Sequence, residues 1–304
     1  MNGKSGKEKV DSPTLLIDCS NLSYAAFYAF GHLGHEGKET GIIYGFLKQV
    51  LNLGLKFKTN SFIFCWDAGV THRHLAYSQY KAKRHKEREL DPEKKKAHQS
   101  LLAQNNTLIH CILPCLGFKN NFVRAWYEAD DLLAYWAKKL RNKKLIMVTS
   151  DADMYQCLDY CDIWSPIKKQ LITKKVFTET FKIKPSQWAL AKAIGGCSGD
   201  NVIGIKGVSD PKKPSSKALV YIQGKLKPGK IKSRIESIEG QKIIEENIPL
   251  VTTPYREDLL RRMFFRKDDF QKKKFVVEFD RLRFDSFLEK KNWKNWKHIF
   301  FKEE

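Results

Sequence analysis

The sequence lacks the features that mark secreted and membrane proteins. Its seven cysteines are odd in number and follow no spacing typical of a disulfide framework, and a chain of 304 residues can bury a sufficient core without cross-links. No apolar run approaches the length needed to span a bilayer, and the stretch from Met1 to Pro13 is polar, without a signal core. These absences exclude a disulfide-stapled or membrane-spanning protein and predict one that acts in a reducing cytoplasm.

Acidic residues are few relative to basic ones. The chain has 34 Asp and Glu against 55 Lys and Arg, which gives a formal net charge of +21 at pH 7. An excess of this size predicts a polyanionic partner such as nucleic acid. The alternative is a basic surface with no special role.

Zinc-binding cysteine clusters are also absent. Two pairs have a suggestive spacing, Cys111 with Cys115 and Cys157 with Cys161. The first pair lies in the apolar run from Ile109 to Leu116, however, where buried free thiols are common. We therefore expect no zinc site from these pairs.

Three short apolar runs are each followed by an acidic residue, and helix-length segments with a repeat of about 3.6 residues separate them. The runs are Leu15–Ile17 before Asp18, Phe62–Trp66 before Asp67, and Leu145–Val148 before Asp151; the helical segments include Ile42–Phe57 and Asp130–Leu140. Strands that alternate with helices predict an α/β fold with a parallel sheet. Because reactive residues lie beyond the carboxyl ends of such strands, the three aspartates are expected to lie near one another.

Further acidic residues extend this set. The candidates for metal binding are Asp18, Asp67, Glu128, Asp130, Asp131, Asp151, Asp153 and Asp200. Buried carboxylates are costly unless they are paired or bind cations, and oxygen ligands suit magnesium, with manganese as a substitute. Two such ions about 4 Å apart would support phosphodiester hydrolysis. The alternative for Glu128 to Asp131 is that they only cap a helix.

The acidic motifs resemble, in order and spacing, those of the 5′ nuclease superfamily. The segments are Leu15–Asp18, Trp66–Asp67, Tyr127–Asp131 and Thr149–Asp153, and the run Asp151–Pro166 is most similar to the phage RNase H and 5′–3′ exonuclease branch. The resemblance implies a PIN-like nuclease core, two metal sites, and cleavage of 5′ flaps and 5′ ends. It places the core in residues 1–184, with a helical arch inserted at about 72–96, and a helical lobe in residues 185–304.

The basic insertion from Arg73 to Arg84 is similar to the family's arch motif. The resemblance implies that Lys81 and Arg84 act on the scissile phosphate, and that Arg73 and Tyr80 contact DNA. Two cations one helical turn apart can meet the same phosphate. A solvated helix face is the alternative.

The glycine-rich run Gly196–Val208 is similar to the family's helix–three-turn–helix, expected at about 185–224. The resemblance implies DNA contacts by Gly204, Lys206, Gly207 and Lys217, and a potassium ion in the loop. Glycine lets the backbone approach a phosphate closely. This chain departs from the pattern in having Cys197 where an Asp is common, and in its longer segment after Val208.

The tail from Thr253 to Phe301 is rich in aromatic residues and lysine, with Trp293, Trp296, Phe300 and Phe301 expected to pack in a core rather than to bind a partner. Taken together, the sequence predicts a monomeric, magnesium-dependent 5′–3′ exonuclease or flap endonuclease. Its substrates would be branched DNA and RNA–DNA hybrids, in replication primer removal beside other replication proteins in a bacterial host. Two alternatives stay open: a PIN-like ribonuclease that cuts single-stranded RNA, and a non-catalytic DNA-binding protein.

Overall fold

The centre of the molecule is a six-stranded sheet. The computed structural model describes residues 12–260 and 263–301, so most of the polar stretch from Met1 to Pro13 lies outside the described residues. The strand order is β5-β4-β1-β6-β7-β8, and every pairing is parallel except that of β8 with β7. The strands are β1 (Thr14–Asp18), β4 (Phe62–Trp66), β5 (Asn121–Val123), β6 (Leu145–Val148), β7 (Asp162–Ser165) and β8 (Gln170–Ile172). The three strands that the sequence predicts are confirmed as β1, β4 and β6.

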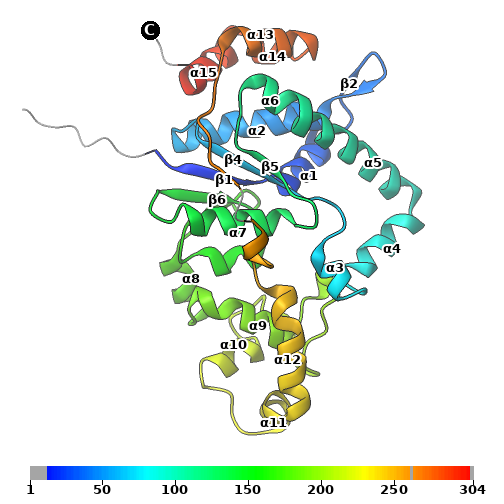
Figure 1. Cartoon of the computed structure of the whole chain (residues 1–304), viewed down its shortest axis with the longest axis vertical. Helices are drawn as coiled ribbons and strands as arrows, with labels where there is room; N and C mark the ends of the chain where they lie inside the picture. Colours follow the sequence, from blue (N-terminus) through cyan, green and yellow to red (C-terminus); the bar gives the residue numbers. More distant parts are fainter. Residues whose placement is uncertain (1–11, 261–262, 302–304) are drawn as a thin grey trace, which may run out of the picture.

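Helices cover both faces of this sheet (Figure 1). Alternate residues of β1 join different cores: Leu15 and Ile17 pack with α2, and Leu16 packs with α7. Because successive side chains of a strand point to opposite faces, a continuous apolar run serves both layers. The flanking helices are α1 (Cys19–Phe30), α2 (Gly41–Phe57), α6 (Leu113–Leu116), α7 (Ala129–Lys139) and α8 (Lys174–Phe181). A small hairpin, β2 (Gly34–His35) and β3 (Lys38–Glu39), projects beside α1.

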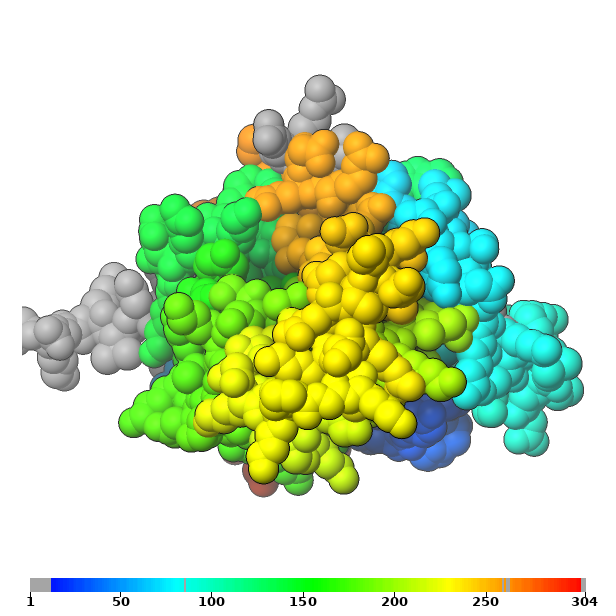
Figure 2. All heavy atoms as spheres, turned by 90° about the horizontal axis from the view of Figure 1, so that it is seen from below, coloured from blue at the N-terminus to red at the C-terminus, as the bar shows by residue number. Residues whose placement is uncertain are grey.

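The basic insertion forms an arch of helices at one side of the molecule (Figure 1). It contains α3 (His72–Ala76), α4 (Ala82–Leu90) and α5 (Pro92–Thr107), which runs into the π-helical turn η1 (Leu108–Ile112). The arch therefore extends beyond the predicted range of about 72–96, because α5 continues to Thr107 and then joins η1. Figure 2 shows the arch flanking the helical lobe when the molecule is seen from below.

The lobe below the sheet has its own apolar core. It is built from α9 (Trp188–Gly195), α10 (Lys217–Ile222), α11 (Lys230–Glu236) and α12 (Ile238–Val251), with the turns η2 (Ala152–Cys157), η3 (Pro185–Gln187) and η4 (Ser198–Asp200) at its border. Tyr80, at the base of the arch, packs in the same core as Ile194 and Val202. The arch is thus docked on the lobe at its base.

The last helices do not belong to this lobe. After η5 (Glu257–Leu260), the helices α13 (Lys272–Arg281), α14 (Asp285–Leu288) and α15 (Lys290–Phe300) lie on the opposite side of the sheet (Figure 1). Phe275, Trp296 and Phe300 join the core that contains Phe62 of β4. The predicted lobe of residues 185–304 is therefore wrong for residues 272–300, because their aromatic side chains complete the sheet's upper core. The expectation that Trp296 and Phe300 are core residues is confirmed. In residues 12–260 and 263–301, no helix is both long and apolar enough to cross a bilayer.

Candidate functional site: two acidic groups under a basic arch

Three acidic residues meet at the carboxyl edge of the sheet. Asp18 ends β1, Asp67 directly follows β4, and Asp151 caps η2 after β6. Because β1 pairs in parallel with both β4 and β6, the ends of these strands are neighbours. With Asp130 at the start of α7, they form a group that we call the strand-end cluster.

Burial dominates the chemistry of Asp18 and Asp130 in the strand-end cluster. Asp18 is 6% exposed and accepts hydrogen bonds from the Asn21 N–H at 3.0 Å and the Thr149 hydroxyl at 2.7 Å. Burial, and then the nearby charge of Asp67, raise the pKa of Asp18 to about 7 in the metal-free protein. Burial and the charge of Asp151 likewise raise the pKa of Asp130 well above its usual range. A buried carboxylate of this kind is unfavourable in its ionised form unless a cation lies beside it.

Asp67 is held by the chain around it. One of its oxygens accepts from the Ala129 N–H at 2.8 Å, at the N-terminus of α7, and the other accepts from the Ser20 hydroxyl. Asp67 itself is exposed, so its carboxylate stays open to solvent. The strand-end cluster is more widely spaced than a closed metal cage. This spacing suits magnesium, which keeps several waters and needs only one or two carboxylates.

A second group lies where η2, α9 and η4 meet. Asp153, Cys197 and Asp200 each offer a ligand atom, and these atoms lie within 4.8 Å of one another, the only such set of three or more in the described residues. We call it the thiol–carboxylate group. The Cys197 thiol donates to Asp200 at 3.2 Å, and burial raises the pKa of Cys197 to about 12. Burial and the charge of Asp151 raise the pKa of Asp153 to about 6.

Sequence reasoning missed Lys192, which lies beside this group. Its ammonium contacts Asp153 at 2.8 Å and Asp210 at 3.1 Å, and its side chain is 6% exposed. The available signal was a lone charge in the otherwise apolar helix from Trp188 to Gly195. A buried lysine of this kind needs carboxylate partners.

The arch places two cations beside the acidic residues. Lys81 contacts Glu128 and lies 3.9 Å from Asp200, while Arg84 lies 3.3 Å from Asp200. The Lys81 backbone is left-handed, with φ of 55°, and its N–H donates to the Asp200 carbonyl at 2.9 Å. Burial lowers the Lys81 pKa, but Glu128 and Asp200 raise it by more, so the ammonium stays charged. The structure thus brings the predicted pair together, with Lys81 capping α4 rather than lying within it.

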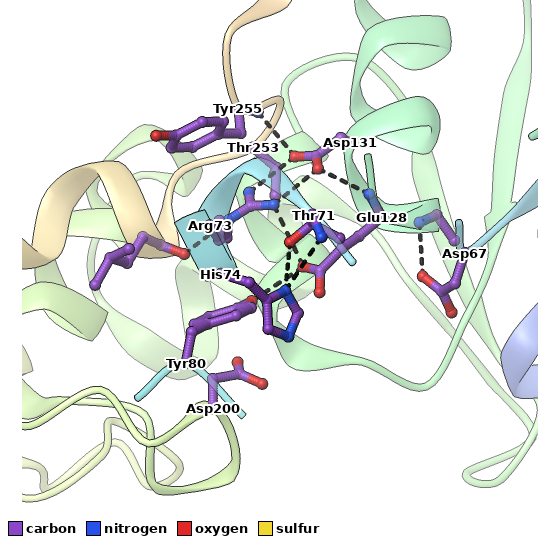
Figure 3. Close-up of polar contacts among 12 residues, drawn as sticks. Asp67, Thr71, Arg73, His74, Tyr80, Glu128, Asp131, Asp200, Thr253 and Tyr255 are labelled. Atoms are coloured by element: carbon purple, nitrogen blue, oxygen red, sulfur yellow. Dashed lines mark hydrogen bonds and ion pairs between the residues drawn. The ribbon is translucent and has the colours of Figure 1, made fainter. Parts of the chain in front are cut away.

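Arg73 is a buried structural residue (Figure 3). Its guanidinium donates to both oxygens of Asp131, at 2.7 and 2.8 Å, and to Glu128 at 3.3 Å. It also donates to the carbonyls of Leu250 at 3.0 Å and Thr252 at 2.8 Å. With 2% of its surface exposed, Arg73 cannot contact DNA, so this prediction is wrong.

Two further predictions are corrected in the same region. Asp131 also accepts from the N–H groups of Glu128 and Tyr255, so Arg73 and these donors occupy both of its oxygens and leave none for a metal ion. Tyr80 is 3% exposed and donates to Glu128 at 3.0 Å, which rules out a direct DNA contact. In a basic segment, sequence composition alone does not tell a buried guanidinium or phenol from an exposed one.

The glycine-rich loop forms the far edge of the site. Gly207 has φ of 89°, and its carbonyl accepts from the Lys217 ammonium at 3.3 Å. Both residues line a cleft of about 380 Å³ with Ser209, Asp210, Lys212, Lys213, Ser215 and Ser216, so the longer segment after Val208 forms most of its wall. Lys206 is exposed beside it. Gly204 is required for packing, because a Cβ there would lie 2.3 Å from the Gly195 carbonyl carbon.

Solved structures share this architecture. The 5′-exonuclease of bacteriophage T5, solved with bound zinc, matches with a TM-score of 0.63 and 19% identity over 79% of this chain and 89% of that one. A variant of the flap endonuclease of bacteriophage T5, solved as a pseudo-enzyme–product complex with DNA and metal ions, matches with a TM-score of 0.61 and 18% identity over 79% of this chain and 88% of that one. At such identity the likeness concerns the fold, and it confirms the predicted PIN-like α/β class.

Sequence relatives give the family. Thermostable DNA polymerase I of Thermus aquaticus is 31% identical over 288 residues, which cover 90% of this chain and 32% of the polymerase. The chain therefore spans about a third of that relative. The 5′–3′ exonuclease of Buchnera aphidicola is 29% identical over 237 residues, 76% of this chain and 77% of the relative. The model of the 5′–3′ exonuclease N-terminal resolvase-like domain matches residues 13–182, more than half of the chain. On this match, the chain belongs to the 5′–3′ exonuclease family.

Proposed function

We propose that this protein is a magnesium-dependent, structure-specific 5′ nuclease that hydrolyses DNA at 5′ flaps and 5′ ends and leaves a 5′ phosphate. The observation that carries the proposal is the convergence of Lys81 and Arg84 on Asp200, with Lys81 close enough to Asp67 and Asp130 of the strand-end cluster for their charges to interact. Carboxylates for cations and fixed cations for a phosphate are the two requirements of phosphodiester hydrolysis.

The chain's own residues divide the work. Asp18, Asp67, Asp130 and Asp151, together with Glu128, would hold magnesium, with manganese as a substitute. When bound, the metal supplies an activated water and neutralises developing charge. Lys81 and Arg84 are the catalytic cations: a phosphodiester replaces the carboxylates that hold them now, and both charges then face the same phosphate.

The surrounding surfaces suggest how DNA is chosen. The exposed lysines Lys206 and Lys217 flank the cleft at Gly207, where they would bind the duplex backbone, with a potassium ion in the loop. The arch lies on the other side, where it would receive the single strand (Figure 2). Recognition would therefore depend on the shape of a junction, with RNA–DNA hybrids as a second substrate and replication primer removal as the role.

The test compares cleavage of end-labelled flap DNA, nicked duplex and single-stranded RNA, with magnesium or EDTA. Asp151→Asn removes one strand-end carboxylate, and Asp159→Asn is the matched control, since Asp159 pairs with Lys174 at 2.7 Å, outside the site. We expect magnesium-dependent incision at the flap junction by the wild type and the control, and none by Asp151→Asn. Tight binding without cutting would make the chain a DNA-binding protein, and cleavage of RNA alone would make it a ribonuclease.

A further inference from the structure

The thiol–carboxylate group is the one place in the described residues where three potential ligand atoms are already gathered, within 4.8 Å of one another. It therefore differs from the strand-end cluster, whose carboxylates are more widely spaced. Asp153 and Asp200 are partly exposed, with 17% and 15% of their side chains accessible, so a cation can reach them from solvent. Cys197 is 6% exposed and forms the inner wall.

The donor set does not fit magnesium well. Magnesium requires oxygen ligands in near-octahedral geometry, and a thiol contributes little to its binding. A thiolate with two carboxylates instead matches the sulfur and oxygen ligands of zinc and similar thiophilic cations. Three protein ligands also leave a fourth position open, which is the arrangement of zinc ions that bind water or substrate.

The charges around the group show that it attracts cations. Lys192 lies 2.8 Å from Asp153, and Arg84 lies 3.3 Å from Asp200. Lys192 has a second partner in Asp210 at 3.1 Å, and Arg84 is half-exposed on the arch. Both side chains can therefore yield one carboxylate to a bound ion without being left unpaired in a buried place.

We propose that Asp153, Cys197 and Asp200 form a mixed thiolate–carboxylate site for a thiophilic divalent cation of the zinc class, separate from the magnesium position at the strand-end cluster. On binding, the Cys197 S–H bond breaks, the proton passes to solvent, and a sulfur–metal bond forms with no redox change. The inference deepens the proposed function, on which it rests for the role of the second metal position.

The probe is cobalt(II), because a bond between cobalt and a thiolate gives a charge-transfer absorption band in the near ultraviolet that carboxylate ligands do not give. The metal-free, full-length chain is titrated with cobalt alone, and then zinc is added to displace it. We expect a band that saturates at one equivalent, disappears with zinc, and is absent in Cys197→Ser. The matched control is the double variant Cys111→Ser with Cys115→Ser, which removes two exposed thiols and should keep the band.

Affinity gives a second measurement. Loss of an outer-shell partner already costs roughly 10–100-fold in metal affinity, so loss of a direct ligand in Cys197→Ser should weaken zinc binding at least about tenfold in calorimetry. Cys197→Asp should shift the preference toward magnesium. Circular dichroism checks that both variants are folded.

The outcomes separate this proposal from the proposed function. A band that persists in Cys197→Ser, or wild-type cobalt binding with no band, overturns the thiolate site even if the chain cuts flap DNA with magnesium. A Cys197-dependent band in a chain that never cuts DNA supports the metal site and overturns the nuclease assignment alone.

Discussion

The buried carboxylate of Asp18 connects the fold with the proposed binding of a metal ion. This carboxylate ends a buried strand and, within residues 12–260 and 263–301, has only two hydrogen-bond donors, the Asn21 N–H and the Thr149 hydroxyl. Two donors do not replace the hydration that an ionised carboxylate loses. A nearby cation would compensate for this loss. The free-energy cost of burying the Asp18 carboxylate without a metal ion therefore supports a cation-binding role for this position.

This cost gives a pH dependence. In the metal-free protein the pKa of Asp18 is raised from 3.8 to about 7, chiefly by burial. Well below pH 3.8 the group is protonated in both the folded and unfolded states. As pH rises toward 7, only the unfolded chain readily loses the proton, so stability falls across that window. In EDTA, Asp18→Asn should therefore melt above the wild type at pH 8, and the difference should shrink at pH 5.

The matched variant for this experiment is Asp159→Asn, whose carboxylate pairs with Lys174 at the surface. It should show no comparable divergence between pH 5 and pH 8. A wild type that is more stable than Asp18→Asn at pH 8 in EDTA would mean that the ionised carboxylate is already compensated within the chain.

Arg73 differs from Asp18 in that its buried charge already has a partner within the protein. It joins α3 to Asp131 of α7 and to the carbonyls of Leu250 and Thr252. Arg73→Met should cost about 3–5 kcal/mol in urea unfolding, because it leaves a buried carboxylate without its partner. Lys83→Met is the control, since the Lys83 side chain is 73% exposed and its loss should change stability little. Equal effects would contradict the buried network.

At the scale of elements, the position of the arch decides where the Lys81 and Arg84 side chains lie. Hydrogen bonds from Lys81 to the Asp200 carbonyl and from Asn201 to the Gln79 carbonyl fix its base on the lobe. The left-handed Lys81 then starts α4, so Arg84 returns to the same side one turn later. The element therefore delivers two cations to one place, while its other lysines face solvent.

This geometry predicts unequal effects along one helix. Lys81→Ala and Arg84→Ala should each lower the single-turnover rate of flap cleavage by roughly 10²–10³-fold, the loss seen when a fixed group that stabilises transition-state charge is removed. Lys83→Ala removes an exposed charge from the same helix and should change the rate little. DNA affinity, measured separately in EDTA, should change little in all three. If Lys83→Ala is equally slow, the arch acts only through its total charge.

The elements also show how far sequence reasoning reaches. The strands β1, β4 and β6 could be predicted, because a short apolar run followed by an acidic residue is typical of a buried parallel strand whose carboxyl end reaches the site. Arg73, Tyr80 and Asp131 could not be assigned, since their partners lie far away in sequence and only the fold reveals that they contact one another. Lys192 was missed for the same reason.

At the scale of the whole molecule, the chain returns to the sheet after building the lobe. Trp296 packs against Phe275 at 5.6 Å between ring centroids, and Phe300 against Phe62 at 6.1 Å. An aromatic helix in the sequence predicts burial but does not say against which surface. The C-terminal helices therefore complete the upper core, which leaves the lower side, with its arch and lobe, free for a substrate.

The lower side carries exposed lysines at the cleft, Lys206, Lys212, Lys213 and Lys217, which we expect to bind the phosphates of a duplex. DNA affinity should fall linearly with salt on a double-logarithmic plot, because each phosphate contact releases counterions. Lys217→Ala should weaken duplex binding similarly for all sequences and reduce the slope by about one. Lys242→Ala is the matched control, since Lys242 is an exposed lysine of α12 whose side chain is 75% accessible and lies 4.0 Å from Glu246. A lower slope in the control alone would place the duplex on α12, whereas a lower slope in Lys217→Ala alone would place it on the cleft at Gly207, on the same side of the molecule as Lys81 and Arg84.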